Sequence, residues 1–229
     1  MSVFYRGDVF VCIKRIQDKS VNLIYIDPPF GTTKNYWDEK IDWSKLFLEM
    51  FRVLKDDGMI VIHTSVPFNY ELIRSAPKPP SYSWYWNKLC ATCPLIANTQ
   101  PMRSCEEILV WKNKKMTYYR QQIGDEMRRS TYMTKNDYYG PTSKTGTTWI
   151  KGKTRTHYLE IKRDIKGFAT RPMEIVKLMI DSYSKEGDTV LDLFCYDGLS
   201  STACQGRRWI GIDKYHYPKL FLENRDGNS

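Results

Sequence analysis

The chain has 229 residues, of which 41% are hydrophobic, and its formal net charge is +9. This composition excludes an intrinsically disordered protein, and the length allows one good core but is too short for two full domains. No apolar run approaches the roughly 18 residues that a transmembrane helix requires. The N-terminal residues also lack the layout of a secretory signal, so we expect a soluble, cytoplasmic protein that has no membrane partner.

The first half of the sequence alternates short apolar runs with an amphipathic segment. Residues 21–26 are an apolar run bounded by polar residues, which predicts a buried strand that ends at Asp27. Hydrophobic residues recur at helical spacing over 43–54, and the Asp-Gly pair at 57–58 is expected to end this helix. A second buried strand is predicted directly afterwards, over 59–63.

Further apolar runs predict the remaining strands, which are residues 82–88, 107–111, 189–192 and 209–213. Residues 89–106 are expected to connect the first two of these strands. Pro172 is expected to open a helix, since proline is tolerated in a first helical turn, where its missing N–H would be unpaired anyway. Short strands that alternate with amphipathic helices predict a layered α/β fold with a mostly parallel, twisted sheet.

The basic charge is concentrated in one segment, residues 112–166. This segment holds fourteen Lys and Arg and five Asp and Glu, and the rest of the chain carries equal numbers of both signs. It is dense in tyrosine and interrupts the alternation of strands and helices, so we interpret it as an insertion. Basic side chains release counterions from a phosphate backbone, and aromatic rings stack on bases. We therefore expect the segment to bind nucleic acid, although a solvated basic surface would have the same composition.

Three of the predicted strands end in an acidic residue that precedes a turn or a loop. These residues are Asp27, Asp192 and Asp213. In open α/β sheets, ligands bind beyond the carboxyl ends of the strands. Each acid alone could be a helix cap or a turn residue, but the three together predict a site with several polar anchors.

The tetrapeptide Asp27-Pro28-Pro29-Phe30 directly follows the first buried strand. Its two prolines have a fixed φ and no N–H, so they form a rigid elbow that holds Asp27 and points the Pro28 carbonyl outward. A carboxylate, a carbonyl and a ring suit an exocyclic amino group on a planar base. The two oxygens would accept its N–H bonds and localise the nitrogen lone pair, which then attacks an electrophilic methyl group in line. A purely structural Asp-Pro-Pro turn is the alternative.

The cysteines give little indication of a metal site. Cys90 and Cys93 have the spacing of half a zinc site, but no second pair completes it and the three histidines stand apart in the sequence. We therefore expect no metal. The six cysteines are too few and too scattered for a disulfide scaffold, and we expect reduced thiols.

The ordered set of motifs closely resembles that of the S-adenosylmethionine (AdoMet)-dependent DNA amino-methyltransferases of the permuted, β class. The matching pieces are Gly7-Asp8, residues 25–43, residues 53–63, Trp86-Asn87-Lys88, residues 101–111, residues 167–172, residues 187–194 and residues 206–213. The resemblance covers nearly all of the chain outside 112–166. It implies a three-layer, Rossmann-like methyltransferase fold with a catalytic half over 1–111, an inserted target-recognition segment over 112–166 and an AdoMet-binding half over 167–229.

The resemblance also implies roles for individual residues. Asp213 is expected to bind the ribose hydroxyls of AdoMet, Asp8 its adenine amino group, and Arg171 is expected near its methionine carboxylate. The full set of expected AdoMet-binding residues is Asp8, Asp27, Arg171, Asp192, Phe194, Tyr196, Gly198, Ser200 and Asp213. The expected catalytic residues, which would grip a base flipped out of the duplex, are Asp27, Pro28, Pro29 and Phe30. The expected DNA-binding residues are Lys34, Tyr36, Trp37, Arg128, Arg129, Lys151, Lys153 and Arg155.

One motif departs from the family. Where the family usually reads DPFxGSGTT, residues 192–201 read DLFCYDGLSS, so that Tyr196 replaces the first glycine. A tyrosine there could clash with AdoMet, or it could turn outward and leave Gly198 to serve. A second alignment places Gly198 on the GSGTT glycine after a two-residue insertion. The helix that follows is expected to be about two residues short, and either alignment bears on the affinity for AdoMet.

The sequence thus predicts a site-specific methyltransferase that flips adenine out of double-stranded DNA and methylates its N6 amino group. Three alternatives remain open. The first is a cytosine-N4 DNA methyltransferase, in which serine more often replaces Asp27, and the second is an RNA adenine methyltransferase. The third is a nucleic-acid-binding relative that Tyr196 has impaired in catalysis. A homodimer and an associated restriction enzyme, as in a restriction–modification system, are further expectations.

Overall fold

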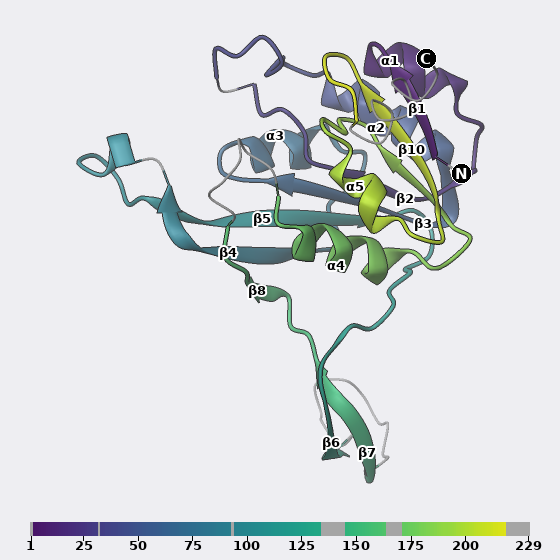
Figure 1. Cartoon of the computed structure of the whole chain (residues 1–229), viewed down its shortest axis with the longest axis vertical. Helices are drawn as coiled ribbons and strands as arrows, with labels where there is room; N and C mark the ends of the chain where they lie inside the picture. The colour runs from purple at the N-terminus through teal and green to yellow at the C-terminus, as the bar shows by residue number, and fades with distance from the viewer. Residues whose placement is uncertain (1, 32, 93, 134–144, 164–170, 219–229) are drawn as a thin grey trace, which may run out of the picture. The chain divides into compact units, whose positions relative to one another are not determined.

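A computed structural model of the protein describes residues 2–31, 33–92, 94–133, 145–163 and 171–218. The chain divides into two compact units (Figure 1). The larger unit contains the residues up to Tyr119 and those from His157 onward, and the smaller unit is Arg120–Thr156. The smaller unit is narrower than the segment 112–166 that the charge pattern marks out. Residues flanking it belong to the larger unit, where the Tyr119 amide, for example, donates a hydrogen bond to the Ser182 carbonyl.

The larger unit is built on a mixed sheet, which in the described residues has eight strands in the order β1-β10-β9-β2-β3-β5-β4-β8. In chain order these strands are β1 (Ser2–Arg6), β2 (Val21–Ile26), β3 (Leu54–Thr64), β4 (Tyr82–Thr92), β5 (Arg103–Lys112), β8 (Tyr158–Glu160), β9 (Thr189–Asp192) and β10 (Arg208–Asp213). Neighbouring strands are parallel except where β5 pairs with β3 and with β4. The predicted α/β fold with a mostly parallel sheet is confirmed.

Helices cover both faces of this sheet (Figure 1), and they are α1 (Val9–Cys12), η1 (Ile13–Arg15), α2 (Trp43–Val53), α3 (Phe68–Ser75), η2 (Pro94–Ile96), α4 (Met173–Tyr183) and α5 (Leu199–Ala203). One hydrophobic cluster joins a face of the sheet to α1, α2 and α3, and it includes the fully buried Phe47 and Trp111. A second cluster joins the other face to α4 and α5, and it includes the fully buried Met179 and Trp209. The three layers of the expected fold are therefore present.

The boundaries of the elements depart from prediction at two places. Helix α2 ends at Val53 and β3 begins at Leu54, although the Asp-Gly pair at 57–58 was predicted to end the helix. Leu54 is fully buried and pairs with Val21 of β2. Strand β3 therefore begins several residues earlier than predicted, and the register between β2 and β3 shifts between Val21 and Leu23. Strands β4 and β5 also extend into the region 89–106, which was predicted to be a connection, because they pair again at Thr92 and Arg103.

The smaller unit is a two-stranded antiparallel hairpin of β6 (Gln122–Met133) and β7 (Thr145–Thr154). The register shifts between Ile123 and Met127. Gly152 lies opposite this irregularity at φ +65°, and a Cβ atom there would lie 2.3 Å from the Gly124 carbonyl oxygen. Only glycine fits so close an approach of the two backbones.

Candidate active site

Four acidic residues gather at one edge of the large sheet. Asp192 and Asp213 are the last residues of β9 and β10, Asp27 directly follows β2, and Asp8 follows β1 after Gly7. The strands β1, β10, β9 and β2 are parallel neighbours in that order, so their carboxyl ends meet at the same edge. The structure therefore brings together the three strand-end acids that the sequence singled out.

The loop after β2 packs against the rest of the protein at Pro28 and at Phe30. Pro28 is buried, and the Asp27 side chain is 30% exposed. Phe30 was predicted to offer its ring to a base. In the structure this ring stacks on Phe68 of α3, with centroids 4.7 Å apart and planes 23° from parallel. One face of Phe30 is thus covered, because Phe68 and the buried Trp43 pack together beside the loop.

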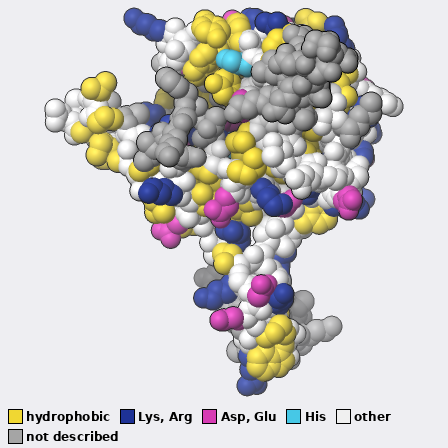
Figure 2. All heavy atoms as spheres, viewed as in Figure 1, with side chains coloured by type: hydrophobic (Ala, Val, Ile, Leu, Met, Phe, Trp, Pro, Cys, Tyr) yellow, Lys and Arg dark blue, Asp and Glu magenta, His cyan; other side chains and the backbone are white. Residues whose placement is uncertain are grey.

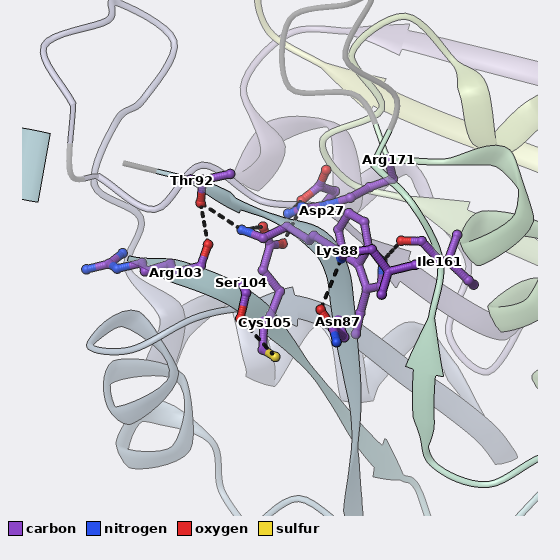
Figure 3. A network of polar contacts seen from close by, with 12 residues as sticks. Asp27, Asn87, Lys88, Thr92, Arg103, Ser104, Cys105, Ile161 and Arg171 are labelled. Atoms are coloured by element: carbon purple, nitrogen blue, oxygen red, sulfur yellow. Dashed lines mark hydrogen bonds and ion pairs between the residues drawn. The ribbon is translucent and has the colours of Figure 1, made fainter. Parts of the chain in front are cut away.

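Arg171 lies between two carboxylates beside the catalytic loop. Its Nη2 donates to the Asp27 carboxylate at 2.7 Å, and its Nη1 donates to Glu106 of β5 (Figure 3). Glu106 in turn accepts from the Nζ of Lys88 on β4, at 3.3 Å. Both ends of the guanidinium thus bind protein carboxylates, and the expected contact of Arg171 with the methionine carboxylate stays a prediction. The segment before it, 164–170, lies outside the described residues.

Glu106 and Lys88 are site residues that sequence reasoning missed. Both lie inside motifs that matched the family, yet neither carries a signal of its own, because β4 and β5 alternate many polar and apolar residues. Only the pairing of β4 with β5, which places Trp86 opposite Glu106, brings Lys88 next to Glu106, and Glu106 is joined to Asp27 through Arg171.

The pKa of Asp27 depends on its burial and on two charged neighbours. Burial raises the pKa of Asp27, the guanidinium of Arg171 opposes that rise through its charge and its hydrogen bond, and Glu106 adds to it. The same two carboxylates raise the pKa of Arg171 although its burial acts in the opposite direction. Behind the loop, the hydroxyl of Tyr25 lies 3.0 Å from Nε2 of His63, and burial holds the pKa of His63 well below its usual value.

The carboxylates of Asp192 and Asp213 accept hydrogen bonds from neighbouring residues of the protein. The Ser200 hydroxyl donates to Asp192, and the Phe194 amide donates to it at 3.3 Å. Asp192 is 4% exposed, and burial raises its pKa to about 7. Asp213 accepts from the amides of Tyr196 at 2.9 Å, Tyr215 at 2.8 Å and His216 at 2.7 Å.

In the glycine-rich motif Tyr196 lies beside His216, and whether its ring leaves room for AdoMet stays a prediction. Tyr196 has φ +45°, a left-handed conformation that favours glycine, and its side chain is 43% exposed with the ring 4.5 Å from that of His216. Gly198 has φ +78° and precedes α5, and a Cβ atom there would lie 2.4 Å from Cβ of Pro218. Helix α5 has only five residues, as the shortened motif predicted.

Asp8 and the loop after the catalytic tetrapeptide complete this edge. Asp8 caps α1 by accepting a hydrogen bond from the Phe10 amide at 2.9 Å. Asp38 ties the loop together, because its carboxylate accepts from the amides of Gly31 and Thr33. The three loop residues predicted to contact DNA are exposed, and they are Lys34, Tyr36 and Trp37. A cavity of about 600 Å³ opens between this loop, α2 and α3.

The hairpin unit presents basic and apolar side chains to solvent (Figure 2). Arg129, Lys151 and Lys153 are exposed, and Trp149 is 65% exposed. Lys151 pairs with Asp125 at 3.1 Å, and Arg155 is half-buried. The backbone of Arg128 lies in β6, but its side chain is outside what the structure describes.

The described residues contain neither a metal-binding cluster nor a membrane-spanning helix. No group of three or more His, Cys, Asp or Glu side chains there is arranged to hold a metal ion, and Cys93 lies outside the described ranges. In the same part of the chain no helix is long and apolar enough to cross a membrane.

Comparison with known proteins identifies the family. The family model described as DNA methylase, of the N6/N4 type, matches residues 21–220, and the chain belongs to this family. Over 97% of its length the chain is 25% identical to the Type II methyltransferase M.BamHI of Bacillus amyloliquefaciens, of which it covers 57%. It is 27% identical to the DNA adenine methyltransferase YhdJ of Escherichia coli K12, covering 96% of this chain and 81% of YhdJ. It covers only 24% of a further relative, the M.SfiI methyltransferase of Streptomyces fimbriatus, so it spans about half or less of these two Type II relatives.

Solved structures agree on the fold. The M1.HpyAVI–SAM complex superimposes with a TM-score of 0.64 at 17% identity, over 98% of this chain and 100% of that one. The PvuII DNA methyltransferase, described as cytosine-N4-specific, also has a TM-score of 0.64, at 14% identity, over 93% of this chain and 82% of that one. At these identities the likeness establishes the three-layer methyltransferase fold.

Proposed function

We propose that this member of the DNA methylase family transfers a methyl group from AdoMet to the exocyclic N6 amino group of adenine in double-stranded DNA. One observation carries the proposal above the others. A carboxylate, Asp27, stands at the end of a buried strand in a rigid Asp-Pro-Pro elbow and is held by an arginine beside two further strand-end acids. The order of the motifs, with the catalytic loop before the AdoMet strands, supports the permuted β class.

The donor set of this edge fits AdoMet. Asp213 accepts one hydrogen bond at Oδ2 and the rest at Oδ1, and because a carboxylate has about four acceptor positions, Oδ2 retains capacity for a ribose hydroxyl. Asp8 is exposed at the end of β1, where it would accept from the adenine amino group of the cofactor. Phe194 and Gly198 would border the methionine part. When bound, AdoMet supplies an electrophilic methyl group on a sulfonium.

The residues of the loop account for the chemistry at the nitrogen. Asp27 and the Pro28 carbonyl accept the two N–H bonds of the amino group, which localises the nitrogen lone pair toward the methyl group. The new N–C bond forms as the S–C bond breaks, and the nitrogen then gives up one proton. The raised pKa of Asp27 makes its carboxylate a better acceptor for that proton. Phe30, with one face on Phe68, keeps only its other face and edge for the base.

Adenine is favoured over cytosine for two reasons. The acceptor at the catalytic position is a carboxylate, where cytosine-N4 enzymes more often have serine, and the relative YhdJ, 81% of which the chain covers, is described as a DNA adenine methyltransferase. Cytosine-N4 methylation stays the second candidate, because PvuII methyltransferase, which shares the fold, is described as specific for it. RNA adenine methylation and an impaired binding protein are further alternatives.

Transfer of labelled methyl from AdoMet to duplex DNA of mixed sequence, followed by digestion to nucleosides and mass spectrometry, tests the proposal. N6-methyladenine above the level of a D27A control is the expected product. N4-methylcytosine would reassign the base, and methylation of single-stranded RNA alone would reassign the substrate. DNA binding that does not respond to AdoMet and yields no product would refute the enzyme. A homodimer and a companion restriction enzyme stay predictions, which light scattering and cleavage-protection assays would test.

A further inference from the structure

Four charged side chains, which are between 5% and 30% exposed, form a continuous chain beside the catalytic loop. It runs from Asp27 after β2, through Arg171 before α4 and Glu106 of β5, to Lys88 of β4 (Figure 3). The exposed fractions of the side chains of Arg171, Glu106 and Lys88 are 13%, 15% and 5%. Thr92 extends the chain, since its hydroxyl accepts from Lys88 at 3.0 Å and donates to the Arg103 carbonyl at 2.8 Å.

The guanidinium of Arg171 spans its two acids by geometry that lysine lacks. A planar guanidinium holds its two terminal nitrogens in a fixed fork, so that Nη1 on Glu106 fixes the direction of Nη2 toward Asp27. The ring of Trp86 lies 5.6 Å from the guanidinium carbon, and the indole Nε1 donates to the Ile161 carbonyl at 2.7 Å, which holds that ring in place. Among the described residues, Arg171 is the polar partner of the Asp27 carboxylate, through Oδ1 alone.

We propose that Arg171 is a positioning residue for the methyl transfer: held by Glu106, it fixes Oδ1 of Asp27 so that Oδ2 faces the target amino group, and its charge keeps that carboxylate ionised. This inference rests on the proposed function, which it deepens. A protonated Asp27 would offer a hydroxyl to the amino group and lose the acceptor that draws out the nitrogen lone pair. Arg171 therefore sets the lowest pH at which the site works.

The charged groups around Asp27 determine the direction in which each substitution should move the pH dependence of activity. Arg171 lowers the pKa of Asp27, whereas Glu106 raises it and burial raises it most. Asp192 of β9 and Tyr25 of β2 interact with Asp27 as well, and His63 of β3 is kept neutral by burial. Removal of Arg171 should therefore move the acid limb of activity to higher pH, and removal of the Glu106 charge should not.

Single-turnover methyl transfer between pH 5.5 and 9 tests the inference in four variants beside the wild type: R171Q, R171K, E106Q and R207Q. Arg207 is a matched control, a buried arginine that pairs with Asp181 at 2.8 Å far along the chain from the loop. We expect the acid limb of R171Q to move up by about one pH unit or more, so that its loss relative to wild type is roughly tenfold at the low-pH end and shrinks as the pH rises. R171K should keep the limb near the wild-type position but transfer more slowly, E106Q should not move it upward, and R207Q should match the wild type.

Two measurements that do not depend on turnover complete the test. A ¹³C NMR titration of labelled aspartates, with D27N to assign the signal, should give a higher Asp27 midpoint in R171Q than in the wild type. The AdoMet dissociation constant of R171Q should stay within about threefold of the wild-type value. An unmoved acid limb and Asp27 midpoint would overturn the inference, as would a large loss of AdoMet affinity with an unmoved limb, which would return Arg171 to the methionine carboxylate.

The two proposals fail separately. If the wild-type chain methylates no nucleic acid, the proposed function is refuted. The NMR titration of Asp27 still tests the positioning role of Arg171 in that case. A higher Asp27 midpoint in R171Q supports this role, and an equal midpoint in both proteins overturns it. Circular dichroism and thermal unfolding of each variant identify any change that comes from loss of the fold.

Discussion

Substitution of Asp192 should stabilise the protein above neutral pH. Its carboxylate is 4% exposed, and burial raises its pKa from 3.8 to about 7, with the neighbouring Asp27 and Asp213 adding to the rise and the Ser200 and Phe194 donors opposing it. A carboxyl group whose pKa is raised on folding binds its proton more tightly in the folded state. Folding stability therefore falls as the pH rises from about 4 to about 7, and the whole penalty is present above that range.

The size of the effect follows from this interval. Three pH units at about 1.4 kcal/mol each give roughly 4 kcal/mol of destabilisation at pH 8. The D192N variant has no charge to bury, but Phe194 and Ser200 donate to different oxygens of Asp192, so one of them would face the NH2 group of the amide, which costs about 1 kcal/mol. We expect D192N to be more stable than the wild type by about 3 kcal/mol at pH 8 and slightly less stable at pH 4.5.

Urea unfolding of both proteins at several values between pH 4.5 and 8 measures this. The difference between the two free energies of unfolding is the quantity of interest, since it cancels the titration of groups that do not interact with Asp192. It should change sign across the range. A difference that stays constant with pH would refute the reasoning, because it would mean that Asp192 titrates alike in the folded and the unfolded chain. A D188N variant, at a half-buried aspartate just before β9, provides the control.

Other substitutions test the assigned roles. D27A should lower methyl transfer by at least about a thousandfold while AdoMet binding, measured by calorimetry, stays near the wild-type value; full activity would overturn the mechanism. D213A should weaken AdoMet binding by about tenfold or more, and an unchanged affinity would remove Asp213 from the ribose site. Y196G should leave AdoMet affinity within about threefold, because the tyrosine side chain already lies 43% exposed; a large gain in affinity would mean that the ring obstructs the cofactor. Replacement of Lys151 and Lys153 together by alanine should lower the slope of log affinity for DNA against log salt concentration by about two, and an unchanged slope would move the DNA contact elsewhere.

Much of the fold could be predicted because the relevant signals are local. The apolar run 21–26 and the acid after it predict β2 and the position of Asp27, and the same reasoning predicts β9 with Asp192 at its end. The end of α2 could not be predicted locally. The Asp-Gly pair at 57–58 looks like a helix stop, but the pairing of Leu54 with Val21, a contact across 33 residues of sequence, decides the boundary.

Some features of the site could also be predicted from local sequence, and others could not. The tetrapeptide from Asp27 to Phe30 marks the catalytic loop by its own composition, but its partners depend on packing between distant elements. Nothing in the sequence near Arg171 indicates that its guanidinium binds Asp27, 144 residues away, rather than a ligand. Phe30 is similar, because only the position of α3 decides that Phe68 covers one face of its ring. Polar side chains in particular are hard to assign, since one residue type serves equally as ligand, cap or ion-pair partner.

The distribution of charge connects these observations to the two proposed substrates. The carboxyl edge of the sheet carries three acids, Asp27, Asp192 and Asp213. The positive charge of Arg171 pairs with Asp27 and also with Glu106. Burial makes this excess of carboxylates costly, as the raised pKa of Asp192 reflects. A cation that enters the edge lowers that cost by favouring the ionised forms, and the sulfonium of AdoMet is such a cation. The segment 112–166, by contrast, holds a net charge equal to that of the whole chain, and a polyanion such as DNA is the ligand that this charge attracts. Under the proposed function, the acidic edge attracts the cationic methyl donor, and the basic segment attracts the phosphate backbone of the DNA whose flipped base enters that same edge.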